Sequence, residues 1–140
     1  LLDIKSFAVK LLPENIHWHF HGYVDNQTLM SIYQKKPYHL FLNVSSSEGV
    51  PVSIMEAMSF GIPCIATDVG GTKEVVENYK NGILLSSDFK PCDLARWIMV
   101  FKKMDETEYQ RYRDNARLSW EECYNADKNY CGFLKYLDDI

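Results

Sequence analysis

The most constraining feature of this sequence is a polar turn that joins an apolar run to a helix-forming segment. Residues 40–44 are largely apolar, as expected of a strand, and the polar turn follows them. Pro51 suits the start of a helix, because the first helical N–H would have no partner inside the helix. Gly61 and Pro63 end that helix, and residues 62–66 form a second apolar run. Strand, turn, helix and strand in this order are typical of a parallel α/β unit.

The rest of the chain extends this unit into a Rossmann-like parallel sheet with flanking helices and a helical C-terminus. Strands are expected at residues 16–20, 38–44, 62–67 and 83–85. One helix is expected to end near residue 12, others to begin near residues 26, 51, 72, 91 and 106, and a last one to fill residues 120–137. Asp105 and Glu108 form a capping box, and the aromatic residues after 120 are expected to pack. The chain is predicted to be one partial domain, with an α/β core at 1–88 and helices at 89–140.

Two glutamates, Glu48 and Glu56, suggest a ligand site beside the central helix. Glu48 lies in the turn beyond the carboxyl end of a strand, where parallel sheets bind ligands. Glu56 lies inside the helix, roughly 8–12 Å away at a rise of ~1.5 Å per residue. The helix N-terminus between them attracts phosphate. Carboxylates accept hydrogen bonds from hydroxyl groups, so the pattern favours a nucleotide-diphosphate sugar. The alternative is that both are solvated charges near a helix end.

The segment SSEGVPVSIMEAMSFGIPCIATDVGG, residues 46–71, with Glu74 after it, resembles a known family. It is similar to the donor half of the group-one, retaining GT-B glycosyltransferases (glycosyltransferase family four), and the resemblance covers about residues 16–85. The resemblance implies that Glu48 contacts the transferred sugar as the catalytic residue, and that Glu56 holds the ribose hydroxyls. It also implies that backbone amides of the turn face the sugar and phosphates, at Gly49, Val50 and Val52. Pro51 stands where family members often have glycine, which removes one N–H donor.

Two further loops enter the implied site through the same resemblance. Gly22, Tyr23 and Val24 would lie near the nucleotide base, where Tyr23 either stacks on the base or packs on its neighbours. Gly70 and Gly71 would border the donor, or would form a purely structural turn.

The resemblance implies a function for a longer protein of which this chain is the truncated C-terminal half. That enzyme would transfer a hexose from a UDP- or GDP-sugar to a hydroxyl acceptor, a saccharide or a lipid-linked glycan, in surface polysaccharide or glycan synthesis. Neither a metal nor another cofactor is expected. The acceptor-binding N-terminal domain, and the basic residues that the family places upstream of residue 16, are expected to be absent from this chain. The chain alone is therefore expected to bind donor weakly and to be inactive. The alternative is a non-catalytic nucleotide-binding module or a degenerate homologue.

Charge and cysteine content narrow the remaining possibilities. The net charge of −4 argues against a nucleic-acid surface. A nicotinamide or flavin enzyme would need G-x-G-x-x-G, where this chain has only Gly70-Gly71. Four cysteines without C-x-x-C spacing predict reduced thiols in a cytoplasmic protein. No apolar run reaches the ~18 residues of a membrane span, although contact with the inner face of the membrane through the other domain is left open.

Three histidines, His17, His19 and His21, alternate along the first expected strand and would share one of its faces. Three imidazoles on one face could hold a zinc ion. The more ordinary interpretation is a partly exposed strand, with Trp18 and Phe20 on its buried face.

Overall fold

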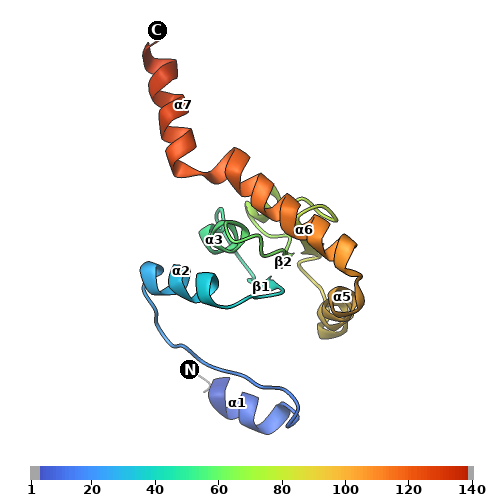
Figure 1. Cartoon of the computed structure of the whole chain (residues 1–140). Helices are drawn as coiled ribbons and strands as arrows, with labels where there is room; N and C mark the ends of the chain where they lie inside the picture. The colour runs from blue at the N-terminus through green and yellow to red at the C-terminus, as the bar shows by residue number, and fades with distance from the viewer. Residues whose placement is uncertain (1–3, 139–140) are drawn as a thin grey trace. The chain divides into compact units, whose positions relative to one another are not determined.

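The computed structural model describes residues 4–138, and the chain divides into two compact units, Leu1–Ile32 and Tyr33–Ile140. The first unit contains α1 (Ile4–Leu11) and most of α2 (Asn26–Lys35), which continues into the second (Figure 1). Both helices confirm sequence predictions, although Leu2 lies outside the described residues. Asp25 caps α2, because its carboxylate accepts the backbone N–H of Thr28 over 2.9 Å.

The prediction of a strand at residues 16–20 is wrong. This segment has no regular secondary structure, and among the described residues no strand pairs with it. Ile16, Trp18 and Phe20 are 45%, 43% and 36% exposed, so the expected buried face does not form. A strand needs a neighbour for its backbone hydrogen bonds, and alternating side chains alone do not provide one.

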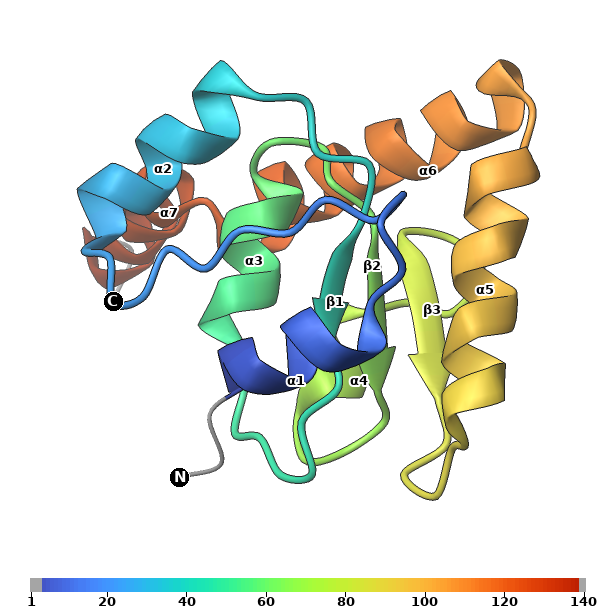
Figure 2. The ribbon, with the colours of Figure 1, turned by 90° about the horizontal axis from the view of Figure 1, so that it is seen from below.

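The second unit is built on a parallel sheet of β1 (Phe41–Asn43), β2 (Cys64–Thr67) and β3 (Gly82–Leu85), in that order (Figure 2). The strands lie within or next to the predicted ranges, and β1 is shorter than expected. Asn43 pairs with Ala66, and Thr67 pairs with Leu85. Because the strands are parallel, their carboxyl ends meet at one edge of the sheet. The predicted α/β fold class is therefore confirmed.

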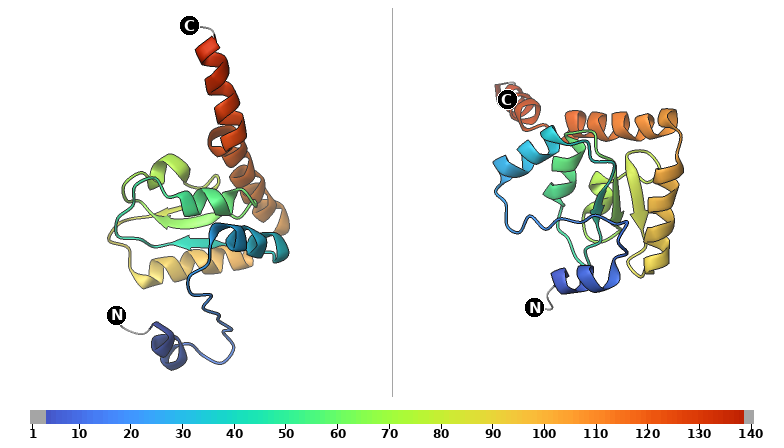
Figure 3. Two further views of the ribbon diagram at one scale, coloured as in Figure 1. Left: turned by 90° about the vertical axis from the view of Figure 1, so that its left-hand side faces the viewer. Right: turned by 60° about the horizontal axis from the view of Figure 1, so that its bottom comes forward.

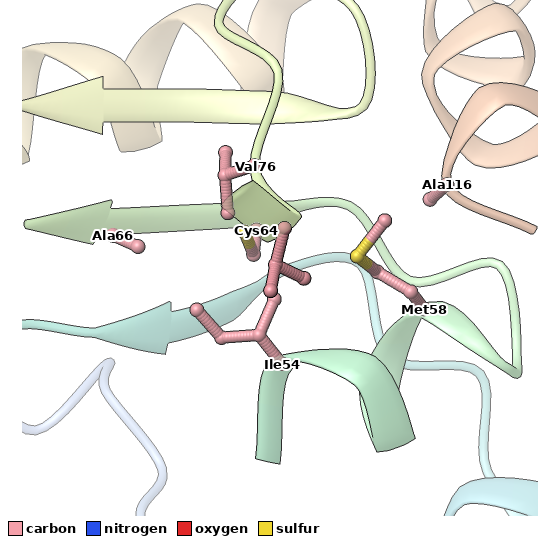
Figure 4. Packing of buried hydrophobic residues seen from close by; sticks show 7 residues of the cluster. Ile54, Met58, Cys64, Ala66, Val76 and Ala116 are labelled. Carbon is pink, nitrogen blue, oxygen red and sulfur yellow. The ribbon is translucent and has the colours of Figure 1, made fainter. Parts of the chain in front are cut away.

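Helices cover both faces of the sheet. On one face, Cys64 and Ala66 of β2 pack against Ile54 and Met58 of α3 (Val52–Met58), as Figure 4 shows. On the other face, Ile65 belongs to a second cluster, to which α5 (Pro91–Lys103) contributes Leu94, Ile98 and Phe101, with Met104 directly after the helix. All four residues of β2 are buried, as expected of a parallel strand covered on both sides.

The helix α6 (Glu106–Ser119) runs across the amino ends of the strands (Figure 3, right). The hydroxyl of Tyr109 donates to the carbonyl of His39, just before β1, over 3.1 Å. Asn115 donates to the carbonyl of Lys80, before β3, over 3.1 Å, and Arg117 donates to the carbonyl of Ser59. The predicted cap is also present, because the Asp105 side chain accepts the Glu108 N–H. The carboxyl edge of the sheet lies opposite to α6.

The prediction of one helix at residues 120–137 is wrong. A π-helical turn, Trp120–Tyr124, ends at Asn125, whose backbone is extended, and α7 (Ala126–Asp138) follows. Trp120 and Tyr124 pack on the first core cluster, but the aromatic and aliphatic side chains of α7 do not. They are 50–69% exposed, and comprise Tyr130, Phe133, Leu134, Tyr136 and Leu137. The break at Asn125 separates Trp120 and Tyr124, which pack on the core, from α7, whose apolar side chains are exposed.

Candidate functional site at the carboxyl edge

Two loops meet at the carboxyl edge of the sheet, one after β1 and one after β2. The backbone N–H of Gly71 donates to the carbonyl of Gly49 over 2.8 Å. Gly70 has a φ of +53° and lies directly against the backbone of Glu48. A β-carbon on Gly71 would lie 2.7 Å from the Gly49 carbonyl oxygen, closer than side chains approach. The glycine pair therefore supports the loop that carries Glu48.

This contact gives the glycine pair a structural role in the loop, and that role is compatible with both interpretations of the pair. Direct contact of Gly70 and Gly71 with a donor stays a prediction. Gly71 occupies the N-cap position of α4 (Thr72–Val75), and Thr72 is the first helical residue. The Thr72 hydroxyl donates to the Val69 carbonyl over 2.7 Å and closes the loop.

The carboxylate of Glu48 is held by the end of β1. Asn43 Nδ2 donates to Glu48 Oε1 over 3.0 Å. The other end of the Asn43 amide, Oδ1, accepts from the Ser45 hydroxyl at 2.7 Å and from the Ser45 N–H at 3.3 Å. Hydrogen bonding to the Ser45 side chain and then to Asn43 lowers the pKa of Glu48, while its partial burial acts in the opposite direction. The Ser45 hydroxyl has a single proton, which it donates either to Asn43 Oδ1 or to Glu48. Glu48 is thus an anion at neutral pH and accepts hydrogen bonds.

Sequence reasoning missed Asn43 and Ser45. Asn43 is a polar residue inside the otherwise apolar run of residues 40–44, and this could have indicated its role. Judged by strand propensity alone, asparagine is only a weak strand former. Its position directly before the turn could have indicated a partner for Glu48.

The helix α3 begins one residue later than expected, with Pro51 as its N-cap. The N–H of Ile54 donates to the Pro51 carbonyl over 3.1 Å, which closes the first turn of the helix. The preceding N–H groups, those of Val52 and Ser53, are helix-start groups without intrahelical acceptors. Val50 and Val52 are 46% and 61% exposed, so the surface of this turn is open.

Glu56 lies on α3 and is half-buried. Its negative charge contributes to the raised pKa of Tyr33, of which burial is the larger cause. The chain therefore brings Glu56 close to the end of α2 that belongs to the second unit.

The three residues expected near the nucleotide base lie in the first unit, and their geometry is given within that unit: Gly22, Tyr23 and Val24. Gly22 has a φ of +71°, which marks a turn, and Tyr23 is 95% exposed. Within the described part of the first unit, Tyr23 does not pack on its neighbours. Its stacking on a base stays a prediction.

The histidine segment does not form the zinc site that was considered. The rings of His19 and His21 lie 4.4 Å apart. Between residues 4 and 138, however, no group of three or more His, Cys, Asp or Glu side chains could hold a metal ion. Within the same range, no helix combines the length and the apolar character that crossing a bilayer requires.

The sequence matches the family described as glycosyl transferases group 1 over residues 5–119. Among curated relatives, the O-antigen biosynthesis glycosyltransferase WbnH of Escherichia coli is 35% identical over 105 residues. The match covers 74% of this chain and 26% of WbnH, so the chain spans about a quarter of the length of that relative.

Solved structures agree with the sequence match. Sucrose-phosphate synthase from Thermosynechococcus elongatus gives a TM-score of 0.78 at 21% identity, over 97% of this chain and 33% of that chain. The Anabaena protein HepE, in complex with UDP-glucose, gives a TM-score of 0.74 at 22% identity, over 98% of this chain and 36% of that chain. These similarities concern the fold, while the family match extends over most of the sequence. The chain belongs to the glycosyl transferases of group 1.

Proposed function

We propose that this chain is the donor-binding half of a retaining GT-B glycosyltransferase of family four. The full enzyme transfers a hexose from a UDP- or GDP-sugar to a hydroxyl acceptor. The observation that carries the proposal is the anionic carboxylate of Glu48, which Asn43 holds at the carboxyl edge of the sheet beside α3. Membership of the group 1 family and the similarity to HepE, which was solved with UDP-glucose, support the class of donor.

In this proposal the two glutamates have different roles. Glu48 accepts a hydrogen bond from a hydroxyl of the transferred sugar and stabilises the positive charge that develops in an oxocarbenium-like transition state. Glu56 accepts hydrogen bonds from the ribose hydroxyls. The bond between the sugar C1 and the phosphate oxygen breaks, and its electron pair leaves with the nucleoside diphosphate. The acceptor oxygen forms the new bond to C1 on the same face, and its proton passes to the departing phosphate.

Backbone groups supply the remaining contacts in this proposal. The amides of Gly49, Val50 and Val52 face the sugar and the diphosphate. Tyr23, with Gly22 and Val24, approaches the base. The exposed surfaces of Val50 and Val52 are compatible with contacts from the turn.

The acceptor in this proposal is a saccharide or a lipid-linked glycan of surface polysaccharide synthesis. The O-antigen assignment of WbnH supports this acceptor class. The reaction takes place in the cytoplasm, with the enzyme placed at the inner face of the membrane by its other domain, and it uses no metal. The chain alone is inactive and binds donor weakly, because its net charge is −4 and Lys73, in α4, is the one Lys or Arg between residues 44 and 79.

The test is a titration of the ¹⁵N-labelled chain with UDP, GDP, UDP-glucose and GDP-mannose, followed by NMR. One nucleotide is expected to shift the resonances of Glu48, Gly49 and Glu56 with a Kd of about 1 mM or weaker. Glu56→Gln should weaken binding of the nucleotide itself, whereas Glu122→Gln, an exposed change, should not. The proposal fails if no ligand at about 10 mM shifts residues 48–56.

Transfer by the longer enzyme separates catalysis from simple binding. Glu48→Gln is expected to lower transfer by about 100-fold or more with the fold retained. A non-catalytic module would show no transfer before or after the change. The anomeric configuration of the product, read from its ¹H coupling constant, tests retention directly.

A further inference from the structure

We propose that Asn43, supported by Ser45, is a positioning residue that fixes the orientation of the Glu48 carboxylate. The inference concerns the side chain of Glu48 itself. Only its meaning for sugar transfer rests on the proposed function.

The polarity of the Asn43 amide follows from its neighbours. The backbone N–H of Ser45 can only donate, and it lies 3.3 Å from Asn43 Oδ1, with the Ser45 hydroxyl at 2.7 Å from the same atom. A flipped amide would place its NH₂ group against that N–H. The NH₂ group must therefore face the other way, toward Glu48 Oε1 at 3.0 Å. The geometry makes Asn43 a donor to Glu48 and an acceptor from Ser45.

Both ends of this hydrogen-bonded group are held by the fold. Asn43 is the last residue of β1 and pairs in register with Ala66, which is fully buried. On the other side, the backbone of Glu48 rests against Gly70, and that of Gly49 accepts the N–H of Gly71 at 2.8 Å. The carboxylate is therefore fixed from its own backbone and from the sheet. A side chain fixed in this way loses less conformational freedom when a ligand binds.

The arrangement leaves part of the carboxylate for a ligand. A carboxylate has about four lone-pair positions on two oxygens; Asn43 occupies one of them on Oε1, and the Ser45 hydroxyl can occupy a second. The remaining positions can accept hydroxyl groups of a sugar. Among the described residues, no charged side chain contributes to the lowered pKa of Glu48: hydrogen bonding to Ser45 and then to Asn43 lowers it, and partial burial opposes this effect.

Replacement by aspartate tests the proposal, because Asn43→Asp keeps the shape and removes the donor. The new carboxylate would still accept from Ser45, but it would face Glu48 with a second negative charge. The pKa of Glu48 should then rise by about one unit or more. Asn43→Ala removes the donor without adding charge and should raise the pKa by a smaller amount.

The control is Asn78→Asp. Asn78 also uses Oδ1 as an acceptor, from the Leu84 N–H at 3.0 Å, and aspartate keeps that role. The measurement is a ¹³C NMR titration of the Glu48 carboxyl group in the 140-residue chain, with backbone spectra to verify the fold. We expect a raised pKa in Asn43→Asp and Asn43→Ala and an unchanged pKa in Asn78→Asp. If the folded Asn43→Ala variant has an unchanged Glu48 pKa, the proposal is overturned. This test holds even if Asn43→Asp does not fold.

Donor titrations of the same variants distinguish this inference from the proposed function. If Glu48 contacts the sugar, Asn43→Ala should weaken UDP-glucose binding several-fold and leave UDP binding within about twofold. A shifted Glu48 pKa with equal effects on both ligands would support the positioning role of Asn43 and contradict the sugar contact of Glu48.

Discussion

The carbonyl oxygen of Glu48 lies 1.9 Å from the point that a β-carbon on Gly70 would occupy. No side chain fits at that distance, and the φ of +53° at Gly70 is itself unfavourable for other residues. The loop after β2 and the loop that carries Glu48 therefore depend on each other for their conformations.

Gly70→Ala should separate the two loops. We expect a loss of unfolding free energy of about 1–3 kcal/mol, together with shifted resonances at Glu48 and Gly49. Urea denaturation and NMR measure both effects. Gly132→Ala in α7 is the control, because within the described residues nothing lies within 4 Å of the added β-carbon. It should be neutral or stabilising by up to about 1 kcal/mol. A Gly70→Ala chain as stable as the parent, with unshifted loop resonances, would contradict this account.

Thr67 and Thr72 are both buried but differ in their hydrogen bonds. Within the described residues Thr67 Oγ1 has no partner, whereas the Thr72 hydroxyl donates to Val69 over 2.7 Å. Thr67→Val should therefore raise the free energy of unfolding by about 1 kcal/mol, and Thr72→Val should lower it by about 0.5–1.5 kcal/mol. Denaturant unfolding of the two variants checks the opposite signs. Equal losses in both would show that the Thr67 hydroxyl is satisfied.

The hydroxyl of Tyr109 connects α6 to the start of β1. Tyr109→Phe removes the bond to the His39 carbonyl and keeps the ring, which stacks on His39 at 5.9 Å. We expect a loss of about 0.5–1.5 kcal/mol in thermal or urea unfolding. Gln110→Ala, on an exposed part of the same helix, should change stability by no more than about 0.5 kcal/mol. Similar effects of both changes would argue that the Tyr109 bond contributes nothing specific.

Burial raises the pKa of Cys64 to about 12. The folded chain thus keeps a thiol proton that the unfolded chain loses above its ordinary value of 9.0, so stability falls as the pH rises between these values. The stability difference between the parent and Cys64→Ala should be constant below pH 9 and shrink above it. A constant difference up to pH 11 would contradict the raised pKa.

Alkylation of the native chain offers a second check at neutral pH. The exposed thiols, at Cys92, Cys123 and Cys131, should react first. Cys64 should react only as fast as the chain unfolds, because the thiolate is the reactive form and the side chain is buried. Mass spectrometry of the labelled peptides distinguishes the sites.

The sequence alone predicted the helices and strands correctly where the local residue pattern and the tertiary packing favour the same structure. Pro51 and Gly61 mark the ends of α3, and the apolar run of β2 is buried on both faces, so the central strand–helix–strand segment was predicted in place. Asp105 likewise identified the start of α6.

The wrong predictions concern features that neighbours decide. Residues 16–20 alternate like a strand, but no strand among residues 4–138 pairs with them. Residues 120–137 have helical spacing throughout, yet the packing of Tyr124 and the extended backbone at Asn125 interrupt the helix. Asn43 was missed for a related reason, since its importance lies in the carboxylate that the turn brings back to it.

The position of α6 has a consequence for how such a chain diversifies. Its hydrogen bonds reach the segments before the strands, at His39, Ser59 and Lys80, and in the part of the chain that the structure describes none reaches the loops that follow β1 and β2. Substitutions accumulating in the loops after β1 and β2 leave these bonds in place. Over evolutionary time, ligand preference can change at one edge of the sheet while the hydrogen bonds that hold α6 persist at the other.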